Sequence, residues 1–236
     1  YIPSLDQNIK KNHININEIN NLYHNLKPHI SYLSYLDLEK IKLALTVSYY
    51  AHYNQKRESR EKFIIHPVNV AIILSKSKPD VETIIGGLLH DTVEDSNITF
   101  NEIEQVFGNE ISNIVEGVTR VTKISKNYSL KSKEEKNFID MKSMFLAMKN
   151  DWRIIIVKIA DRLHNMRTLC FMPKNKQLEI SQETLDIYAP LAQKIGMWNI
   201  RVELEDLSLK YLDPITYYNV ESALNKQRQY YQDKCA

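Results

Sequence analysis

The chain has 236 residues, of which 43% are hydrophobic and 25% charged, and its formal net charge at pH 7 is +2. These values are typical of a soluble globular protein with a buried core. They give no sign of a protein built around a nucleic-acid backbone or a membrane surface. Two cysteines, Cys170 and Cys235, are too few for a disulfide framework and favour a reducing compartment. The apolar runs are too short to span a bilayer.

Helical periodicity dominates the chain. Only five glycines and seven prolines occur, which leaves little room for hairpins or glycine-rich phosphate loops. Thr99 and Glu102 form a predicted capping box for a helix that stops at Gly108. Asp213 caps another helix, with Pro214 in its first turn. Apolar spacing and these signals predict helices over 38–56, 66–78, 99–108, 109–122, 133–149, 176–195, 200–211 and 214–231.

The segment 151–169 is ambiguous by local pattern. Four β-branched residues at 154–157 favour a strand. Leu163, Met166 and Leu169 follow at helical spacing, and the unbroken length favours a single buried helix. We therefore predict an all-α protein without internal repeats.

Titratable residues cluster where the apolar helical stretch 82–89 ends. Four of them occupy six positions: His90, Asp91, Glu94 and Asp95. On a continuous helix, residues four apart share a face, so these residues would form two ligand-like pairs beside a buried stripe. The simpler interpretation is a helix end that emerges into solvent.

A second cluster of polar residues lies on the predicted helix 151–169. Asp161, Asn165 and Thr168 are spaced i, i+4, i+7 and share a helical face. An Asp within an apolar helix must be paired or must hold a metal, because an unpaired buried charge costs several kcal/mol. Pairing with Arg162 or Arg167 is the structural alternative.

The third stretch places His66 at a helix start among apolar residues. A lone histidine of this kind is more often a hydrogen-bonded core residue than a ligand. The order His66, then His90-Asp91, then Asp161 resembles the H…HD…D signature of the HD phosphohydrolase superfamily. Two imidazoles and two carboxylates suit a divalent metal of intermediate hardness, with positions left for water and substrate.

Within that superfamily, the chain resembles the hydrolase half of long RelA/SpoT-type enzymes of the stringent response. The similarity runs from about residue 22 to the C-terminus. Its motifs are HPVNVAIIL (66–74), GGLLHDTVEDSNIT (86–99), EGVTRVTKI (116–124), VKIADRLHNMRTL (157–169) and ETLDIYAPLAQKIGMWNIRVELEDLSLKYLDP (183–214). The resemblance implies an HD-domain helical bundle. It divides the chain into an Asn-rich N-terminal arm (1–37), a hydrolase domain (38–198) and helices leading toward a synthetase domain (199–236).

The resemblance also implies an activity. The family removes the 3′-pyrophosphate of guanosine tetra- and pentaphosphate, giving GDP or GTP and pyrophosphate. The implied metal is Mn²⁺, held by His66, His90, Asp91 and Asp161. Glu94 would orient or deprotonate a water whose pKa the metal lowers, and Asp95 would protonate the leaving 3′-oxygen.

Six residues are implied substrate contacts. Arg57 matches the family arginine that packs against the base, and Asn165 and Thr168 match positions near the guanosine. Lys123, Lys158 and Tyr188 are candidates for phosphate or ribose contacts, although a solvated or packing role fits each of them as well.

The loop 57–63 departs from the family pattern, which reads Arg-Lys-Ser-Gly-x-Pro-Tyr. Here Glu58 replaces the lysine, Arg60 the glycine and Lys62 the proline. These changes leave the metal chemistry intact and put the preference for base and substrate in question.

Two alternatives to this function stay open. One is an HD phosphohydrolase of another nucleotide, against which the segment IYAPLAQKIG (187–196) argues. The other is a catalytically silent regulatory domain that binds alarmone. Silent members have typically lost the His-Asp or the Glu-Asp pair, and both pairs are present here.

The expected partners follow from the same resemblance. They are guanosine tetra- or pentaphosphate and a synthetase domain in the full-length chain, with no direct nucleic-acid or membrane contact. The chain starts at Tyr1 rather than Met, so we expect a processed protein or a fragment. The expected location is the cytoplasm for a bacterial source and a plastid-type organelle for a eukaryotic one.

Overall fold

The structure, a computed structural model, describes residues 15–127 and 133–235. These residues form helices and loops without a strand, and Lys56 and Lys62 form an isolated antiparallel bridge. The predicted all-α class is confirmed. The chain divides into two compact units, Tyr1–His164 and Asn165–Ala236. The domain boundaries expected near 38 and 198 stay a prediction.

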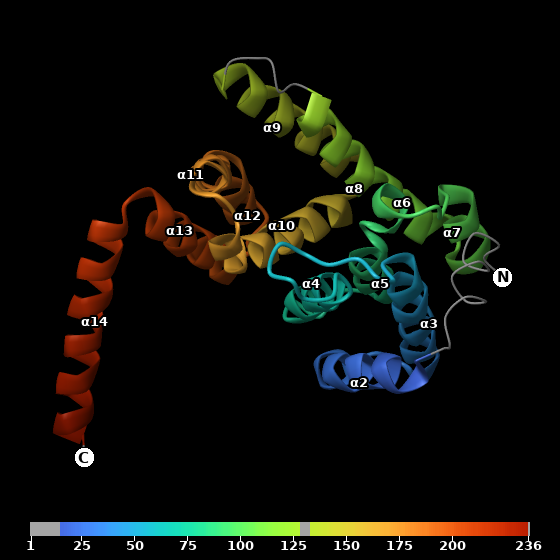
Figure 1. Ribbon diagram of the computed structural model, residues 1–236, viewed down its shortest axis with the longest axis horizontal. Coiled ribbons are helices and arrows are strands. Elements are labelled where there is room, and N and C mark those ends of the chain that lie inside the picture. The colour runs from blue at the N-terminus through green and yellow to red at the C-terminus, as the bar shows by residue number, and fades with distance from the viewer. Residues whose placement is uncertain (1–14, 128–132, 236) are drawn as a thin grey trace. The chain divides into compact units, whose positions relative to one another are not determined.

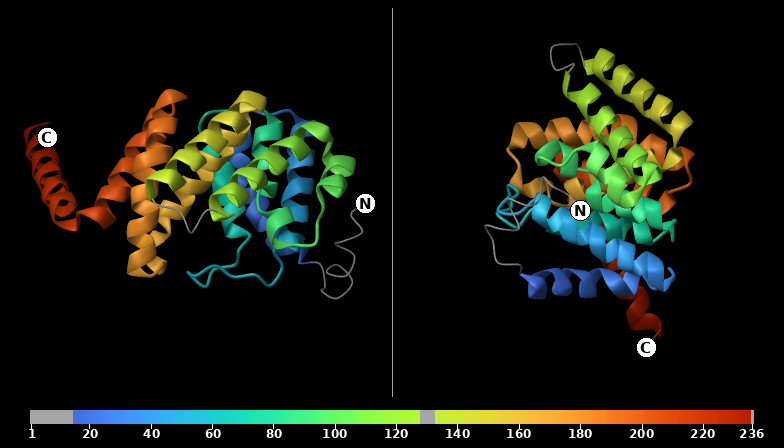
Figure 2. Two further views of the ribbon diagram at one scale, coloured as in Figure 1. Left: turned by 90° about the horizontal axis from the view of Figure 1, so that it is seen from above. Right: turned by 90° about the vertical axis from the view of Figure 1, so that its right-hand side faces the viewer.

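The first unit contains ten helical segments in its described part (Figure 1). In chain order they are α2 (Ile16–Leu26), η2 (Lys27–Ile30), α3 (Tyr35–Ala51), α4 (Ile65–Ser75), α5 (Val81–Leu89), α6 (Thr92–Asp95), α7 (Phe100–Phe107), α8 (Asn109–Asn127), α9 (Lys133–Asn150) and α10 (Trp152–Arg167), whose last residues belong to the second unit. Helices α8 and α9 pack side by side in both views of Figure 2.

Helix α5 is the centre of this unit. All nine of its residues except Glu82 are buried, and it packs against α3, α4 and α8. Two glycines make this close packing possible. A Cβ at Gly86 would lie 2.7 Å from Ile114 of α8, and one at Gly87 would clash with Leu74 of α4. The two glycines therefore let α5 sit deep in the core, with His90 at its end.

Local sequence signals account for several helix boundaries. The capping box of α7 is present, with Thr99 and Glu102 bonding reciprocally, and Gly108 ends the helix with φ 94°. The Thr216 N–H donates to Asp213 Oδ1 at the start of α14 (Pro214–Cys235). The ambiguous segment is one helix, α10, as predicted.

The second unit contains five further helical segments in addition to α14. They are η3 (Leu169–Phe171), α11 (Lys174–Glu183), the π-helical segment η4 (Thr184–Tyr188), α12 (Ala189–Lys194) and α13 (Trp198–Leu212), with α14 completing the unit. The predicted helix 176–195 is wrong in one respect, because it widens into a π-turn at 184–188. Pro190 has no N–H to donate within the helix, and the Ala189 N–H instead reaches back to Thr184 O.

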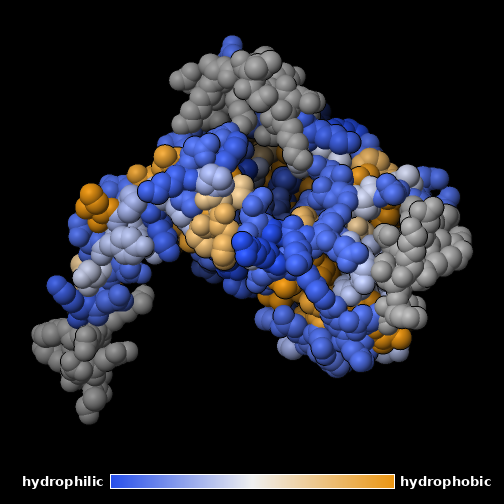
Figure 3. Space-filling view, in the orientation of Figure 1, coloured by the Kyte–Doolittle hydropathy of each residue, from blue (hydrophilic) through white to orange (hydrophobic). Residues whose placement is uncertain are grey.

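No helix in the described ranges is long and apolar enough to cross a bilayer. The face in Figure 3 is mostly hydrophilic, with apolar residues in small groups. Scattered exposed apolar residues of this kind are normal for a folded protein.

Candidate metal centre and active site

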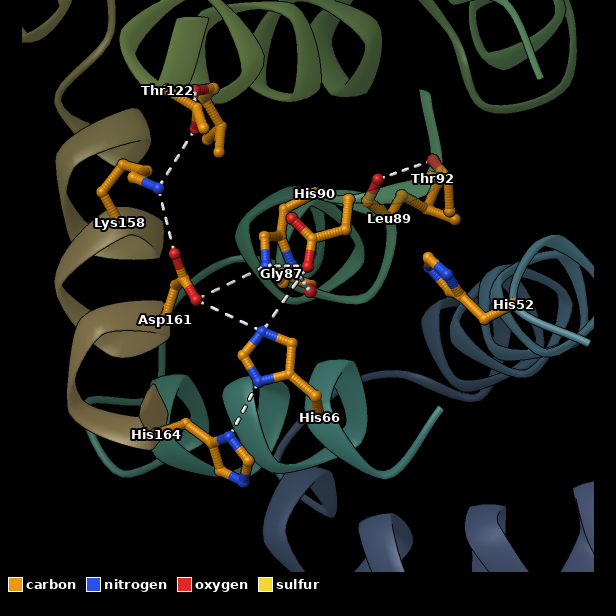
Figure 4. A network of polar contacts seen from close by, with 12 residues as sticks. His52, His66, Gly87, Leu89, His90, Thr92, Thr122, Lys158, Asp161 and His164 are labelled. Atoms are coloured by element: carbon orange, nitrogen blue, oxygen red, sulfur yellow. Dashed lines mark hydrogen bonds and ion pairs between the residues drawn. The ribbon is translucent and has the colours of Figure 1, made fainter. Parts of the chain in front are cut away.

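His66, the adjacent pair His90-Asp91, and Asp161 converge in the first unit. Figure 4 shows His66, His90 and Asp161 directed at one another. The ligand-type atoms of His66, His90 and Asp161 lie within 4.8 Å of one another. Asp91 Oδ2 lies 3.0 Å from His90 Nε2 and 3.6 Å from His66 Nε2. The structure therefore brings together all four residues that the sequence predicts as metal ligands.

The chain breaks its helix between His90 and Asp91. Helix α5 ends at Leu89, and Asp91 lies at the N-terminus of the separate one-turn helix α6. The helix is therefore not continuous from α5 through Glu94, and face-sharing along one helix does not explain the cluster. The break lets His90 and Asp91, although adjacent in sequence, both direct side-chain atoms at the same point.

Hydrogen bonds behind the two imidazoles orient their rings. His90 Nδ1 lies 2.8 Å from Gly87 O, and because a carbonyl only accepts, Nδ1 carries the proton. Nε2 is then the nitrogen that faces the cluster, and its lone pair is the one that a metal ion would use. His66 Nδ1 lies 2.7 Å from His164 Nδ1. That contact also leaves Nε2 of His66 to face the carboxylates.

Lys158 is the charged partner of Asp161. Its Nζ donates to Asp161 Oδ2 at 3.0 Å and to Thr122 Oγ1 of α8 at 3.2 Å. The other carboxylate oxygen, Oδ1, lies 3.2 Å from His66 Nε2. Arg167, one of the partners considered from sequence, instead forms a two-bond pair with Glu203. Lys158 thus holds one oxygen of Asp161 and leaves the other directed at the cluster.

Burial and charge act in opposite directions on this cluster. Burial lowers the pKa of His66, although Asp161 opposes it. Burial also disfavours a charged His90, yet the carboxylate of Asp91 prevails and raises the pKa of His90 to about 9. Burial would raise the pKa of Asp91, and the neighbouring His90 charge lowers it to about 2. The carboxylates thus favour a positive charge at this point.

The donor set fits a divalent cation. His90 is 0% exposed and His66 is 2% exposed. The buried Nε2 of His90 makes no hydrogen bond of normal geometry within the described part of the chain. Two imidazole nitrogens and two carboxylates can hold an ion such as Mn²⁺, Fe²⁺ or Zn²⁺.

The two predicted acid–base residues, Glu94 and Asp95, lie within α6, just after Asp91. Glu94 is half-buried and Asp95 is exposed. Asp91 O accepts from the Asp95 N–H at 3.0 Å, so both acids lie within one helical turn of a candidate ligand. This placement agrees with the roles expected for them, which stay predictions.

The loop 55–63 is a short hairpin beside the cluster. Its ladder consists of the Lys56–Lys62 bridge, the Arg57 N–H bond to Glu61 O and the Phe63 N–H bond to Gln55 O. The Arg57 guanidinium lies 5.8 Å from the centre of the Phe63 ring. Burial lowers the pKa of Arg57, while the negative charges of Asp161 and Asp91 oppose that shift. The guanidinium is therefore near enough to the cluster to interact electrostatically with its carboxylates.

The three departures from the family pattern lie on the outside of this hairpin. Arg60 has φ 65°, the left-handed conformation that glycine adopts without strain. Lys62 pairs with Glu18 of α2 at 2.5 Å. Glu58 is exposed and makes no ion pair among the described residues.

The remaining predicted substrate residues lie in several places. Lys123 is exposed on α8. Asn165 is in the last turn of α10, and Thr168 follows the end of that helix, so the expected single helical face is interrupted there. Tyr188 is buried in the π-helical segment. These last three belong to the second unit, and their contacts with substrate stay predictions.

Three polar residues near the cluster carried no sequence signal that we used. They are His52, Gln55 and His164. His164 stands within the motif 157–169, but only its contact with His66 reveals a role. His52 and Gln55 follow an apolar helix and contact each other, and their further partners, Phe63 and Asp95, lie outside this segment. No local spacing rule identifies such pairs.

A protein-family model described as an HD domain matches residues 44–198, well over half of the chain. The chain belongs to the HD domain family. HD hydrolases depend on metal, and His66, His90 and Asp161 form a triad that could hold a metal ion in this chain. The assignment agrees with the order of ligand residues in the sequence.

Curated relatives extend this result. The chain is 50% identical over 213 residues to "Putative GTP diphosphokinase RSH1, chloroplastic" of Arabidopsis thaliana, covering 87% of this chain and 24% of that protein. It is 41% identical over 191 residues to "Guanosine-3′,5′-bis(diphosphate) 3′-pyrophosphohydrolase" of Aquifex aeolicus, with coverages of 81% and 26%. It is 38% identical over 198 residues to "Bifunctional (p)ppGpp synthase/hydrolase SpoT" of Escherichia coli, with coverages of 84% and 28%.

The chain thus spans about a quarter of the length of these relatives. Their names confirm the predicted resemblance to RelA/SpoT-type enzymes.

Proposed function

We propose that this chain hydrolyses the 3′-pyrophosphate of guanosine tetra- and pentaphosphate. The observation that carries the proposal is the convergence of two histidines and two aspartates in an HD domain. The names of the Aquifex aeolicus and Escherichia coli relatives support this choice of substrate. The balanced reaction adds water across the bond between phosphorus and the 3′-oxygen, and it yields GDP or GTP and pyrophosphate.

The proposed metal is Mn²⁺, held by His66, His90, Asp91 and Asp161. When bound, it lowers the pKa of water and neutralises negative charge on the pyrophosphate. Lys158 keeps Asp161 ionised and oriented, because its Nζ bonds Oδ2 and leaves Oδ1 facing the imidazoles. The specific choice of manganese rests on the resemblance and on the mixed nitrogen and oxygen donors.

Glu94 and Asp95 are the proposed proton carriers. Glu94 takes the proton of the attacking water, and Asp95 gives a proton to the leaving 3′-oxygen. Both follow Asp91 within one turn, which keeps them close to the ligands. General acid–base catalysis of this kind contributes roughly 10²–10⁴-fold.

Arg57 is the proposed contact with guanine. Its guanidinium already lies over the Phe63 ring, and a planar guanidinium can also stack on a base. Asn165 and Thr168 are proposed to lie near the guanosine, and Lys123 and Tyr188 near phosphate or ribose. Lys158, also considered for such a contact, has partners within the protein, Asp161 and Thr122.

The proposal extends to the longer protein that the relatives suggest. A synthetase domain in the full-length chain is inferred from the name of the Escherichia coli relative. The proposed location is the cytoplasm for a bacterial source and a plastid-type organelle for a eukaryotic one, and the relatives include both kinds.

The deciding experiment measures pyrophosphate release from guanosine tetraphosphate. Chelation should abolish release, and added Mn²⁺ should restore it. A panel of other nucleotides assayed with Mn²⁺ separates this activity from a general nucleotide phosphohydrolase. Full activity in excess chelator would contradict the metal-dependent mechanism, and binding of alarmone without turnover would favour a regulatory domain.

A further inference from the structure

We propose that Gln55 is a positioning residue that ties the hairpin 55–63 to the turn bearing Glu94 and Asp95, with His52 holding the Gln55 amide in place. This inference rests on the proposed function, because it assigns the tether to the acid–base step. Neither Gln55 nor His52 is a candidate metal ligand or proton carrier.

The side-chain amide of Gln55 bridges two segments. Its Nε2 donates to the main-chain oxygen of Asp95 at 2.6 Å, across 40 positions of sequence. Its Oε1 lies 2.8 Å from His52 Nδ1. Because a main-chain carbonyl only accepts, the amide can take only this orientation. Oε1 must then accept, and His52 Nδ1 must donate.

His52 is a rigid anchor for this bridge. It is 3% exposed at the C-terminal end of α3, and its ring stacks on Phe63 with centroids 4.4 Å apart and planes 25° apart. Burial lowers its pKa, which agrees with a neutral ring that donates from Nδ1. The backbone of Gln55 is held as well, because its N–H donates to His52 O and its carbonyl accepts from the Phe63 N–H.

The turn at the other end needs such support. Helix α6 has four residues, and a single helical turn in isolation is unstable because nucleation costs more than its few hydrogen bonds return. Its last carbonyls have no partner within the helix. Gln55 supplies a donor to one of them, Asp95 O.

Arg57 stands two residues after Gln55 in the same hairpin. The Gln55 side chain thus links the hairpin that carries Arg57, the proposed guanine contact, to the helical turn that carries Glu94 and Asp95. The tether should therefore act on turnover, because it places Glu94 and Asp95 relative to a substrate that Arg57 holds.

The first test compares Gln55→Met with the unchanged chain. Methionine keeps the length of the side chain and removes both hydrogen bonds. The kcat for alarmone hydrolysis should fall about 2- to 10-fold, the equivalent of one neutral hydrogen bond. Mn²⁺ affinity should be unchanged. Gln177→Met is the matched control, because Gln177 Nε2 also donates to a main-chain oxygen, that of Met172. Its kinetics should match the unchanged chain.

The second test reads the tether without catalysis. Amide hydrogen exchange across residues 92–98 should accelerate about 2- to 10-fold in Gln55→Met and stay unchanged in Gln177→Met. If the unchanged chain does not hydrolyse alarmone, the proposed function fails while this measurement still judges the tether. A fall in kcat with unchanged exchange would indicate direct substrate contact by Gln55 and overturn the proposal, as would unchanged exchange and unchanged kcat together.

Two variants of His52 complete the test and guard against a Gln55 variant that fails to fold. His52→Phe keeps a ring against Phe63 and removes the donor, so it should reproduce the losses of Gln55→Met. His52→Asn places an amide N–H near the position of Nδ1 and should recover part of the kcat. Equal activity of His52→Phe and the unchanged chain would refute the proposed role of His52 in holding the Gln55 amide.

Discussion

The ligand cluster and the hairpin 55–63 respond to sequence change in opposite ways. His66, His90 and Asp161 of the cluster are buried and Asp91 is partly exposed. Their polar atoms have partners elsewhere in the fold, either on another helix or one turn away in the same helix. His66 contacts His164, for example, and Asp161 contacts Lys158. The hairpin is held mainly by its own backbone, and Glu58 and Arg60 are exposed. A change in the cluster therefore breaks several contacts at once, whereas the hairpin absorbs changes at its exposed positions.

The hairpin is nevertheless not uniform. Its inner residues, Gln55 and Phe63, bond or stack against His52, and Arg57 lies over Phe63. Lys62, which replaces the proline of the family pattern, forms an ion pair with Glu18. The chemistry near the cluster is thus kept on the inner side, and the departures from the family pattern lie on the outer side.

The most damaging change should be the loss of a candidate ligand. Asp91→Ala should lose bound metal, and activity should fall by about 10⁴-fold or more, because a catalytic metal supplies several kcal/mol. Metal content after dialysis and pyrophosphate release measure both effects. The exposed Glu58→Ala serves as the control from the hairpin and should retain its metal. An Asp91→Ala protein with full metal content would remove Asp91 from the ligand set.

Glu94→Gln should separate proton transfer from metal binding. The amide keeps the shape of the side chain but cannot take a proton, so kcat should fall by roughly 10²–10⁴-fold while metal content stays constant. Steady-state kinetics together with metal analysis test this. If the variant were metal-free, Glu94 would be a ligand and its assigned role would be wrong.

Glu58→Lys tests whether the altered outer side of the hairpin meets the substrate. The change replaces an anion by a cation near a highly charged nucleotide, so KM should fall severalfold at low salt and less at high salt. The kcat should change little, because the residue is not part of the cluster. Kinetics at two salt concentrations check this. An unchanged KM at low salt would mean that Glu58 faces solvent only.

Arg60→Gly should have the smallest effect and should be favourable. A residue other than glycine in the left-handed region costs roughly 1–2 kcal/mol, and the extra backbone entropy of glycine offsets about 0.5–1 kcal/mol of that. The midpoint of thermal unfolding should therefore rise by about 1–4 °C. Arg60→Ala keeps the Cβ in the same conformation and should give no gain. Equal gains in both variants would show that the arginine side chain, rather than φ, is the source.

The sequence by itself determined the helical class, most helix boundaries and the identity of the candidate ligands. Helix ends follow from contacts between residues three or four positions apart, such as the Thr99–Glu102 capping box. The local sequence is enough to predict such contacts. The ligands were found because their types recur in a fixed order along the chain, which needs no knowledge of distance.

Only the tertiary structure decided how those residues are used. The break between α5 and α6 depends on α5 packing between α4 and α8, where Gly86 and Gly87 allow close contact. The contact of His66 with His164 spans 98 positions, and that of Gln55 with Asp95 spans 40. Pairs this far apart meet only when helices pack. Hydrophobic burial is not directional, so local sequence spacing does not predict which helix faces it brings together.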